Sequence, residues 1–134
     1  MPRPIHRSLY CWLAVISATA ALVPSTPLFG AELSKEVSTA AEHAGYAADA
    51  ALLTTTQAHL HHTVNCLVGP NGKGFDESFG NPCNGQGNGA IPETTDAATK
   101  TKLESALTVT RQAVATSDMT AAKKGASDTA AMLK

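Results

Sequence analysis

Glycine and proline crowd one segment in the middle of this chain. Residues 69–92 hold seven of its ten glycines and three of its seven prolines. The segment opens with Gly69-Pro70, which ends a helix because glycine accepts the left-handed cap conformation and proline cannot continue the helix. It also carries apolar side chains that a flexible linker does not need, namely Phe75, Phe79 and Ile91. We therefore expect an ordered loop whose apolar residues pack against helices on both sides.

The chain before this loop repeats its apolar residues at helical spacing. From residue 33 to residue 68 they recur every three or four positions, at Leu33, Val37, Ala40, Ala44, Ala47 and Ala51 and, less cleanly, at Ala58, Leu60, Val64 and Leu67. This period is typical of an amphipathic helix. Residues 54–56 are three consecutive threonines, whose β-branched side chains weaken a helix locally. The pattern fits either one long helix or two shorter ones with a break near residues 54–57.

Two further helices are expected after the loop. Thr94 or Thr95 can cap the first, which has an apolar stripe, and Ser117-Asp118 can end it and cap the second. The stripes are Leu103, Leu107, Thr110 and Val114, then Met119, Ala122, Ala126, Ala130 and Leu133. A short connection makes these helices antiparallel neighbours. With no strand-like alternation, the sequence predicts an all-α, up-and-down bundle of three to four helices in one domain, residues 32–134.

The first 31 residues have the order of a secretory signal peptide. Arg3 and Arg7 precede an apolar run at residues 9–23, and two prolines and small residues follow. The run is about 15 residues long, short of the roughly 20 that a permanent membrane helix needs. We expect residues 1–31 to be cleaved, leaving no stable membrane span and a periplasmic or secreted protein. A retained anchor is the alternative.

Removal of this leader changes the cysteine count and the charge. Cys11 leaves with it, and Cys66 and Cys83 remain as an even pair in an oxidising compartment, which predicts a disulfide. The remaining chain has eight basic and eleven acidic residues, which gives a formal charge of −3. Nucleic acid is therefore a poor candidate partner, because phosphate binding needs a clustered excess of positive charge.

Three of the five histidines lie in the sequence HLHHTVNC, residues 59–66. Residues three or four apart share a helix face, so His59 and His62 can converge, whereas His61 points about 100° away. Imidazole is the commonest protein metal ligand, but Zn²⁺, Cu²⁺ or Ni²⁺ needs more than two ligands. We expect His61, or Asp76 and Glu77 of the loop, to assist. The alternative is that these histidines are partly buried and hold the loop through hydrogen bonds.

His43 lies 16 residues before His59, roughly 24 Å away along a straight helix. It can join the other histidines only if the chain folds back near residues 54–56. The favoured interpretation is a straight helix, with His43 as a second, separate surface histidine.

Other motifs in the sequence do not meet the requirements of the sites that they resemble. The stretch GPNGKG lacks the spacing of a phosphate-binding loop, and NGKGFD matches one calcium repeat imperfectly. There is no Cys-x-x-Cys-His for covalent haem, and a haem held by His59 or His62 with Met119 or Met132 is disfavoured. No Ser/His/Asp spacing and no paired carboxylates point to catalysis, so a non-enzymatic protein is expected.

The block HLHHTVNCLVGPNGKGFDESFGNPCNGQGNGAIP resembles the central signature of a set of small exported bacterial proteins that are mostly described as hypothetical. The stretch AEHAGYAADAA is loosely similar to the helices of small periplasmic metal-binding proteins, which repeat histidine about every seven residues. That family carries histidines on all its helices, whereas none occurs here after His62. The resemblance therefore implies one or two metal sites at most, not a high-capacity scavenger.

Together these observations predict an exported helical protein with a divalent-metal site. The alternative is a module that binds an envelope protein through the loop closed by Cys66 and Cys83. Changes such as Phe75→Ala and Phe79→Ala would then abolish binding of that partner.

Overall fold

The computed structural model describes residue 1 and residues 28–134, so the expected signal peptide lies almost wholly outside the described residues. Its helices are α1 (Leu28–Asp49), α2 (Leu53–Val68), the single-turn α3 (Ala90–Glu93), α4 (Ala97–Ala115) and α5 (Met119–Met132), with a short 3₁₀ helix, η1 (Glu77–Phe79). The part of the chain described contains no strand. The all-α prediction is confirmed, and the four long helices match the upper end of the expected number.

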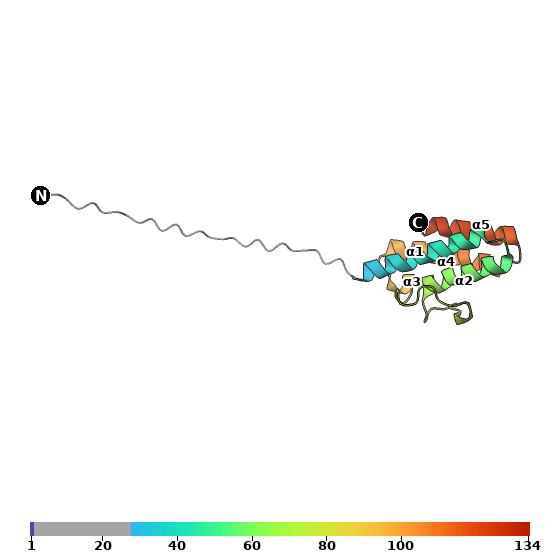
Figure 1. The fold of residues 1–134 in the computed structure, drawn as a ribbon, viewed down its shortest axis with the longest axis horizontal. Coiled ribbons are helices and arrows are strands. Elements are labelled where there is room, and N and C mark those ends of the chain that lie inside the picture. The colour runs from blue at the N-terminus through green and yellow to red at the C-terminus, as the bar shows by residue number, and fades with distance from the viewer. Residues whose placement is uncertain (2–27) are drawn as a thin grey trace.

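The four long helices form an up-and-down bundle (Figure 1). α1 packs against α2 and α5, and α4 packs against the same two helices from the other side. The start of α2 meets the end of α4, since Gln57 Nε2 donates to the carbonyl oxygens of Val114 and Thr116, both at 3.1 Å. The end of α1 likewise meets the start of α5, where Lys123 Nζ donates to the Ala50 carbonyl at 3.2 Å. Neighbouring helices therefore run antiparallel.

The N-terminal helical segment is broken, but not where the threonines indicated. The break lies at residues 50–52, and residues 54–56 form the first turn of α2. Leu52, the residue before α2, has an extended backbone and makes no side-chain cap bond. The chain reverses here, so α1 and α2 lie side by side. This reversal decides which histidines can meet.

Small side chains let the helices approach closely. Ala40, Ala44 and Ala47 of α1 are fully buried. A Cβ atom added to Gly125 of α5 would lie 2.6 Å from Cβ of Ala113 on α4. Hydroxyl groups buried in these tight contacts are hydrogen-bonded, as between Oγ1 of Thr110 and Thr129 at 3.1 Å. Buried alanine and threonine thus fill much of the space between the helices, beside leucines such as Leu60 and Leu67.

Aspartates cap both C-terminal helices. The Asp118 carboxylate accepts a hydrogen bond from the Ala121 amide at 2.7 Å, as expected for the start of α5. For α4 the expectation of Thr94 or Thr95 was wrong, because Asp96 is the cap and accepts from the Thr99 amide at 2.7 Å. Thr94 instead ends α3 and is buried. Aspartate is at least as good a cap as threonine, so the helix begins at the later residue.

The loop at residues 69–92 is ordered and folded back on the bundle. Gly69 ends α2 with φ 70°, and a Cβ there would lie 1.7 Å from the carbonyl oxygen of Asn88, so only glycine fits. The predicted disulfide joins Cys66 to Cys83, both buried. Phe75 and Ile91 pack against the core as expected, whereas Phe79 is 37 % exposed.

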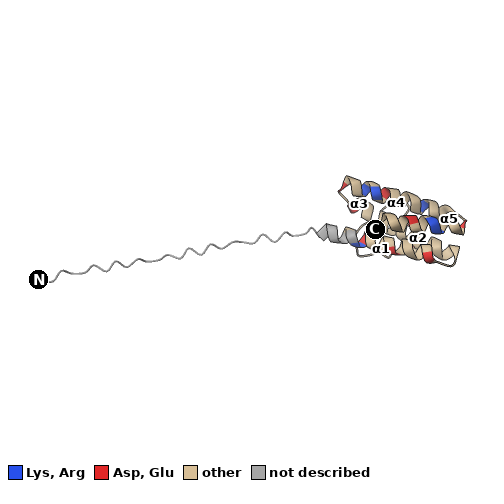
Figure 2. Cartoon of the chain, turned by 90° about the horizontal axis from the view of Figure 1, so that it is seen from above, with Lys and Arg blue, Asp and Glu red and all other residues tan. Residues whose placement is uncertain are grey.

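None of the helices within the described residues is both long and apolar enough to span a bilayer. Basic and acidic side chains are interspersed along these helices (Figure 2). Lys124 and Asp128, one turn apart on α5, form an exposed ion pair.

Candidate metal centre

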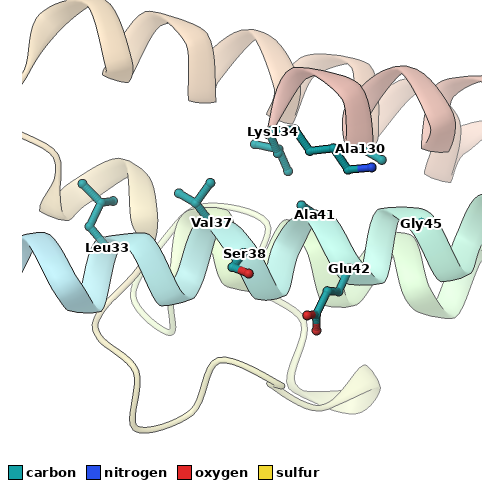
Figure 3. A pocket seen from close by; sticks show the side chains of 9 residues that line it. Leu33, Val37, Ser38, Ala41, Glu42, Gly45, Ala130 and Lys134 are labelled. Carbon is teal, nitrogen blue, oxygen red and sulfur yellow. The ribbon is translucent and has the colours of Figure 1, made fainter.

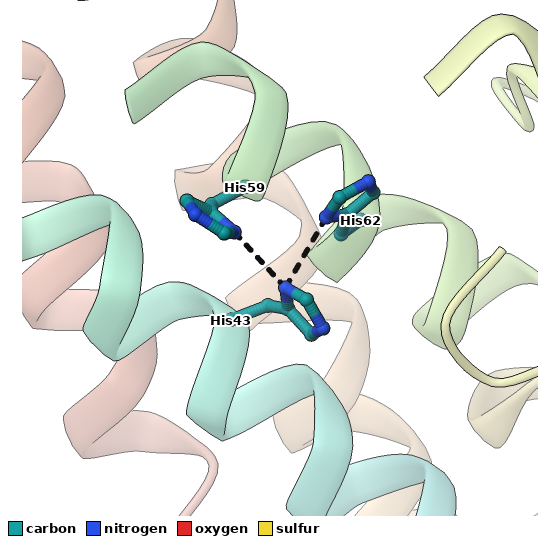
Figure 4. Close-up of side chains that lie close together, drawn as sticks. All are labelled: His43, His59 and His62. Atoms are coloured by element: carbon teal, nitrogen blue, oxygen red, sulfur yellow. Dashed lines mark hydrogen bonds between the residues drawn. The ribbon is translucent and has the colours of Figure 1, made fainter. Parts of the chain in front are cut away.

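Three histidines from two helices converge on one point (Figure 4). His43 comes from α1, and His59 and His62 come from adjacent turns of α2. Nδ1 of His43 lies 3.1 Å from Nδ1 of His59 and 3.2 Å from Nδ1 of His62. One ligand atom from each of the three residues lies within 4.8 Å of the others, an arrangement that can hold a metal ion.

The interpretation of His43 as a separate surface histidine was therefore wrong. It assumed a straight helix, and the reversal at residues 50–52 brings α1 back along α2. The predicted convergence of His59 and His62 is present, and His43 adds a third nitrogen to that pair.

The ring of Tyr46 packs against this His43–His59–His62 cluster. The Tyr46 ring meets that of His43 edge-on, with centroids 5.6 Å apart, and lies 5.5 Å from that of His59. The His43 and His62 rings are also edge-on, at 4.7 Å. All three histidines are half-buried. The rings are thus held in place by packing while the site stays accessible from outside.

The loop supplies a hydrogen-bond acceptor to the outer side of His62. Nε2 of His62 lies 2.6 Å from the carbonyl oxygen of Phe79. A carbonyl oxygen only accepts, so Nε2 carries the hydrogen and donates it. In neutral His62, Nδ1 then presents a lone pair to His43. Histidines that bind metals usually donate their other ring N–H to such an oxygen.

With all three imidazoles neutral, the close nitrogen contacts cannot all be ordinary hydrogen bonds. Nδ1 of His43 carries either one hydrogen or one lone pair, yet it faces the nitrogens of both His59 and His62. One hydrogen cannot complete two full hydrogen bonds, and a lone pair on His43 would face the lone pair of His62. A cation placed among the three nitrogens accepts all three lone pairs.

The environment keeps two of these histidines in the neutral form. Burial lowers the pKa of His43 from 6.5 to about 4, with further lowering by the nearby His62 and His59. Burial also lowers the pKa of His59, again assisted by His62. Neutral imidazole is the form that binds metals, so near pH 7 neither ring first has to lose the extra proton of the imidazolium form.

The spacing of the nitrogens suits a tetrahedral ion. Two ligands at about 2.0–2.1 Å from Zn²⁺ are about 3.3–3.4 Å apart in a tetrahedron. The separations from His43, 3.1 Å to His59 and 3.2 Å to His62, are close to that value. The positions of His59 and His62 relative to His43 are therefore compatible with ligands of one tetrahedral ion.

The other predicted ligands lie in different surroundings. His61 stacks on Phe79, with ring centroids 3.8 Å apart and planes 4° from parallel. The Asp76 carboxylate accepts hydrogen bonds from the Ser78 amide at 3.0 Å and the Ser78 hydroxyl at 2.6 Å, and these bonds lower its pKa. Glu77 is exposed, beside Pro70 and Gly80 in the loop. None of the three belongs to the cluster.

Asn65 is a site-supporting residue that sequence reasoning missed. It is fully buried on α2, and its Nδ2 donates to the carbonyl oxygens of Asp76 at 2.8 Å and Gly80 at 2.6 Å. Its Oδ1 accepts from the Asp76 amide at 2.9 Å. The only sequence signal is a polar amide one residue before Cys66, on the side of the helix that the loop must cover.

Two grooves lie away from the histidines. One runs between α1 and α5, has a volume of about 710 Å³ and is lined largely by aliphatic residues, including Leu33, Val37, Ala41 and Ala130 (Figure 3). The other, about 630 Å³, lies between the loop and α4, and its lining includes both apolar residues and the basic residues Lys73, Lys100 and Arg111.

No protein-family model, no curated protein and no solved structure matches this chain. A functional assignment therefore has to come from the chemistry of the site.

Proposed function

We propose that this chain is a non-enzymatic, exported helical protein that binds a divalent transition metal ion, Zn²⁺, Cu²⁺ or Ni²⁺, through His43, His59 and His62. The observation that carries the proposal is the position of His43 Nδ1, within 3.2 Å of two other imidazole nitrogens. A hydrogen-bonded cluster of three neutral imidazoles leaves one of these contacts without a proper hydrogen bond. A bound cation would accept a lone pair from each nitrogen and so would account for both close contacts.

The choice of metals follows from the donors. Three imidazole nitrogens suit borderline ions such as Zn²⁺, Cu²⁺ and Ni²⁺, whereas Ca²⁺ and Mg²⁺ prefer oxygen. Because Cys66 and Cys83 are bonded to each other, their sulfur atoms are not available as metal ligands. Export is supported by the same disulfide, because such bonds persist in oxidising compartments. The competing prediction, a loop that binds an envelope protein, has no specific observation in its favour.

Isothermal titration with Zn²⁺, Cu²⁺ and Ni²⁺ tests the proposal. We expect a dissociation constant tighter than about 0.1 mM for at least one of them. His43→Ala, His59→Ala and His62→Ala should each weaken it by tenfold or more, because each removes one of three ligands. His61→Phe is the matched control, since it removes an imidazole from the same helix but keeps the aromatic stack on Phe79.

Two results would overturn this assignment. One is a wild-type constant weaker than about 0.1 mM for all three metals. The other is an affinity unchanged in His43→Ala, which would mean that metal binds elsewhere on the chain.

A further inference from the structure

The disulfide-closed loop touches the candidate metal site at a specific atom. Phe79, the last residue of η1, directs its carbonyl oxygen at Nε2 of His62, 2.6 Å away. Its ring stacks on His61, the residue before His62. The backbone of Phe79 therefore contacts His62, and its side chain contacts His61, the preceding residue of α2.

The loop itself is fastened to the next turn of the same helix. Asn65 holds both ends of the η1 turn, through the backbone of Asp76 and the carbonyl of Gly80. Cys66 then ties the loop covalently to Cys83. His62, Asn65 and Cys66 lie three and four residues apart and so occupy one helix face, which is the face that the loop covers.

This attachment determines which nitrogen of His62 is free to bind a metal. A neutral histidine exchanges its hydrogen between Nδ1 and Nε2, and only the nitrogen without hydrogen can be a ligand. The Phe79 carbonyl retains the hydrogen on Nε2, so the lone pair is on Nδ1 and faces His43. Without that acceptor, Nδ1 carries the hydrogen for part of the time and the lone pair points away from the cluster.

We propose that the loop from Asp76 to Gly80 is the outer shell of the metal site, with Phe79 as the positioning residue for His62. The disulfide and Asn65 then serve metal affinity as well as fold stability, because they hold the Phe79 carbonyl in place. The inference rests on the proposed function. Since coupling between two binding events is reciprocal, bound metal should in turn hold the loop against α2.

Substitutions in the stack between His61 and Phe79 test this inference without touching a ligand or the buried disulfide. Phe79→Ala and His61→Ala both remove the stack, whereas His61→Phe keeps it and serves as the matched control. Loss of an outer-shell partner typically costs 10–100-fold in metal affinity, and loosening one should cost about tenfold. We expect that loss of Zn²⁺ affinity in both alanine variants and wild-type affinity in His61→Phe, by isothermal titration.

A second measurement reads the effect on His62 directly. Long-range ¹⁵N–¹H NMR spectra of the metal-free protein report which ring nitrogen carries the hydrogen. We expect the Nε2–H form of His62 in the wild type and in His61→Phe, and a mixture of both forms in Phe79→Ala and His61→Ala. Far-UV circular dichroism checks that the variants remain folded, as expected for a partly exposed stack.

The inference is overturned if both alanine variants keep the wild-type His62 form and bind Zn²⁺ as the wild type does. Failure of the proposed function would look different. The wild type would then bind no Zn²⁺, while the NMR measurement would still show whether the loop sets the His62 hydrogen.

Discussion

Nδ1 of His43 lies 3.1 Å from Nδ1 of His59, although 16 residues separate the two in the sequence. The contact depends on the reversal at residues 50–52, which lays α1 against α2. It turns a pair of histidines on one helix into a three-nitrogen cluster shared by two helices. A ligand bound there would connect the two helices directly.

Acid should destabilise the metal-free protein through this cluster. The pKa of His43 is lowered to about 4 in the folded state, against 6.5 for the free side chain. Between these values the unfolded chain takes up a proton that the folded chain does not, so the free energy of unfolding falls as the pH drops from 6.5 to 4. Urea denaturation at several pH values measures it. His43→Gln, which does not titrate, should reduce this slope, and an unchanged slope would contradict the lowered pKa.

Bound metal should raise the free energy of unfolding. A ligand that binds only the folded state adds about 2.7 kcal/mol to the free energy of unfolding at a free concentration 100 times its dissociation constant. We expect a Zn²⁺-dependent rise in melting temperature for the wild type and for His61→Phe, measured by scanning calorimetry. His43→Ala should show little or none. An equal rise in all three proteins would place the bound metal outside the cluster.

Much of the architecture could be predicted from the sequence because it depends on local patterns. Gly69-Pro70 does end α2, and Asp118 does cap α5. The disulfide followed from counting cysteines after the expected loss of Cys11. The spacing of His59 and His62 correctly placed both on one face of a helix.

The part of the site that could not be predicted depends on tertiary contacts. Residues 50–52 are Ala-Ala-Leu and contain no glycine or proline, so nothing local marks the end of α1. The reversal is held by Lys123 of α5, bound to the Ala50 carbonyl, and by Gln57, bound to the end of α4. The spacing of apolar residues along the sequence does not reveal such tertiary hydrogen bonds. His43 was consequently assigned to a separate surface.

Gly45 of α1 and Gly125 of α5 should respond oppositely to substitution by alanine. A Cβ on Gly45 of α1 would meet nothing within 4 Å, so Gly45→Ala should stabilise the protein by about 0.5–1 kcal/mol through helix propensity. A Cβ on Gly125 would lie 2.6 Å from Cβ of Ala113, so Gly125→Ala should destabilise it by about 1–3 kcal/mol through overpacking. Chemical denaturation of both variants measures the difference. The same sign for both would show that the close contact between α4 and α5 is not formed.

The disulfide should contribute substantially to the stability of a fold whose core contains many small side chains. Cys66 and Cys83 are 17 residues apart, and closing a loop of that size stabilises a fold by about 3 kcal/mol in the chain-entropy model. We expect the double variant Cys66→Ala/Cys83→Ala to lose roughly that amount in urea denaturation. Wild-type protein unfolded in the presence of a dithiol reductant provides the comparison without a change of side chain. A loss below about 1 kcal/mol in both would mean that Asn65 and the packing of Phe75 hold the loop without the covalent bond.

Crystals of the full chain soaked in Zn²⁺, with anomalous diffraction recorded at the zinc edge, test the central claim most directly. We expect one strong anomalous peak about 2.0–2.1 Å from Nδ1 of each of His43, His59 and His62. No peak among these nitrogens at saturating Zn²⁺, or the dominant peak at Asp76 and Glu77 instead, would contradict it.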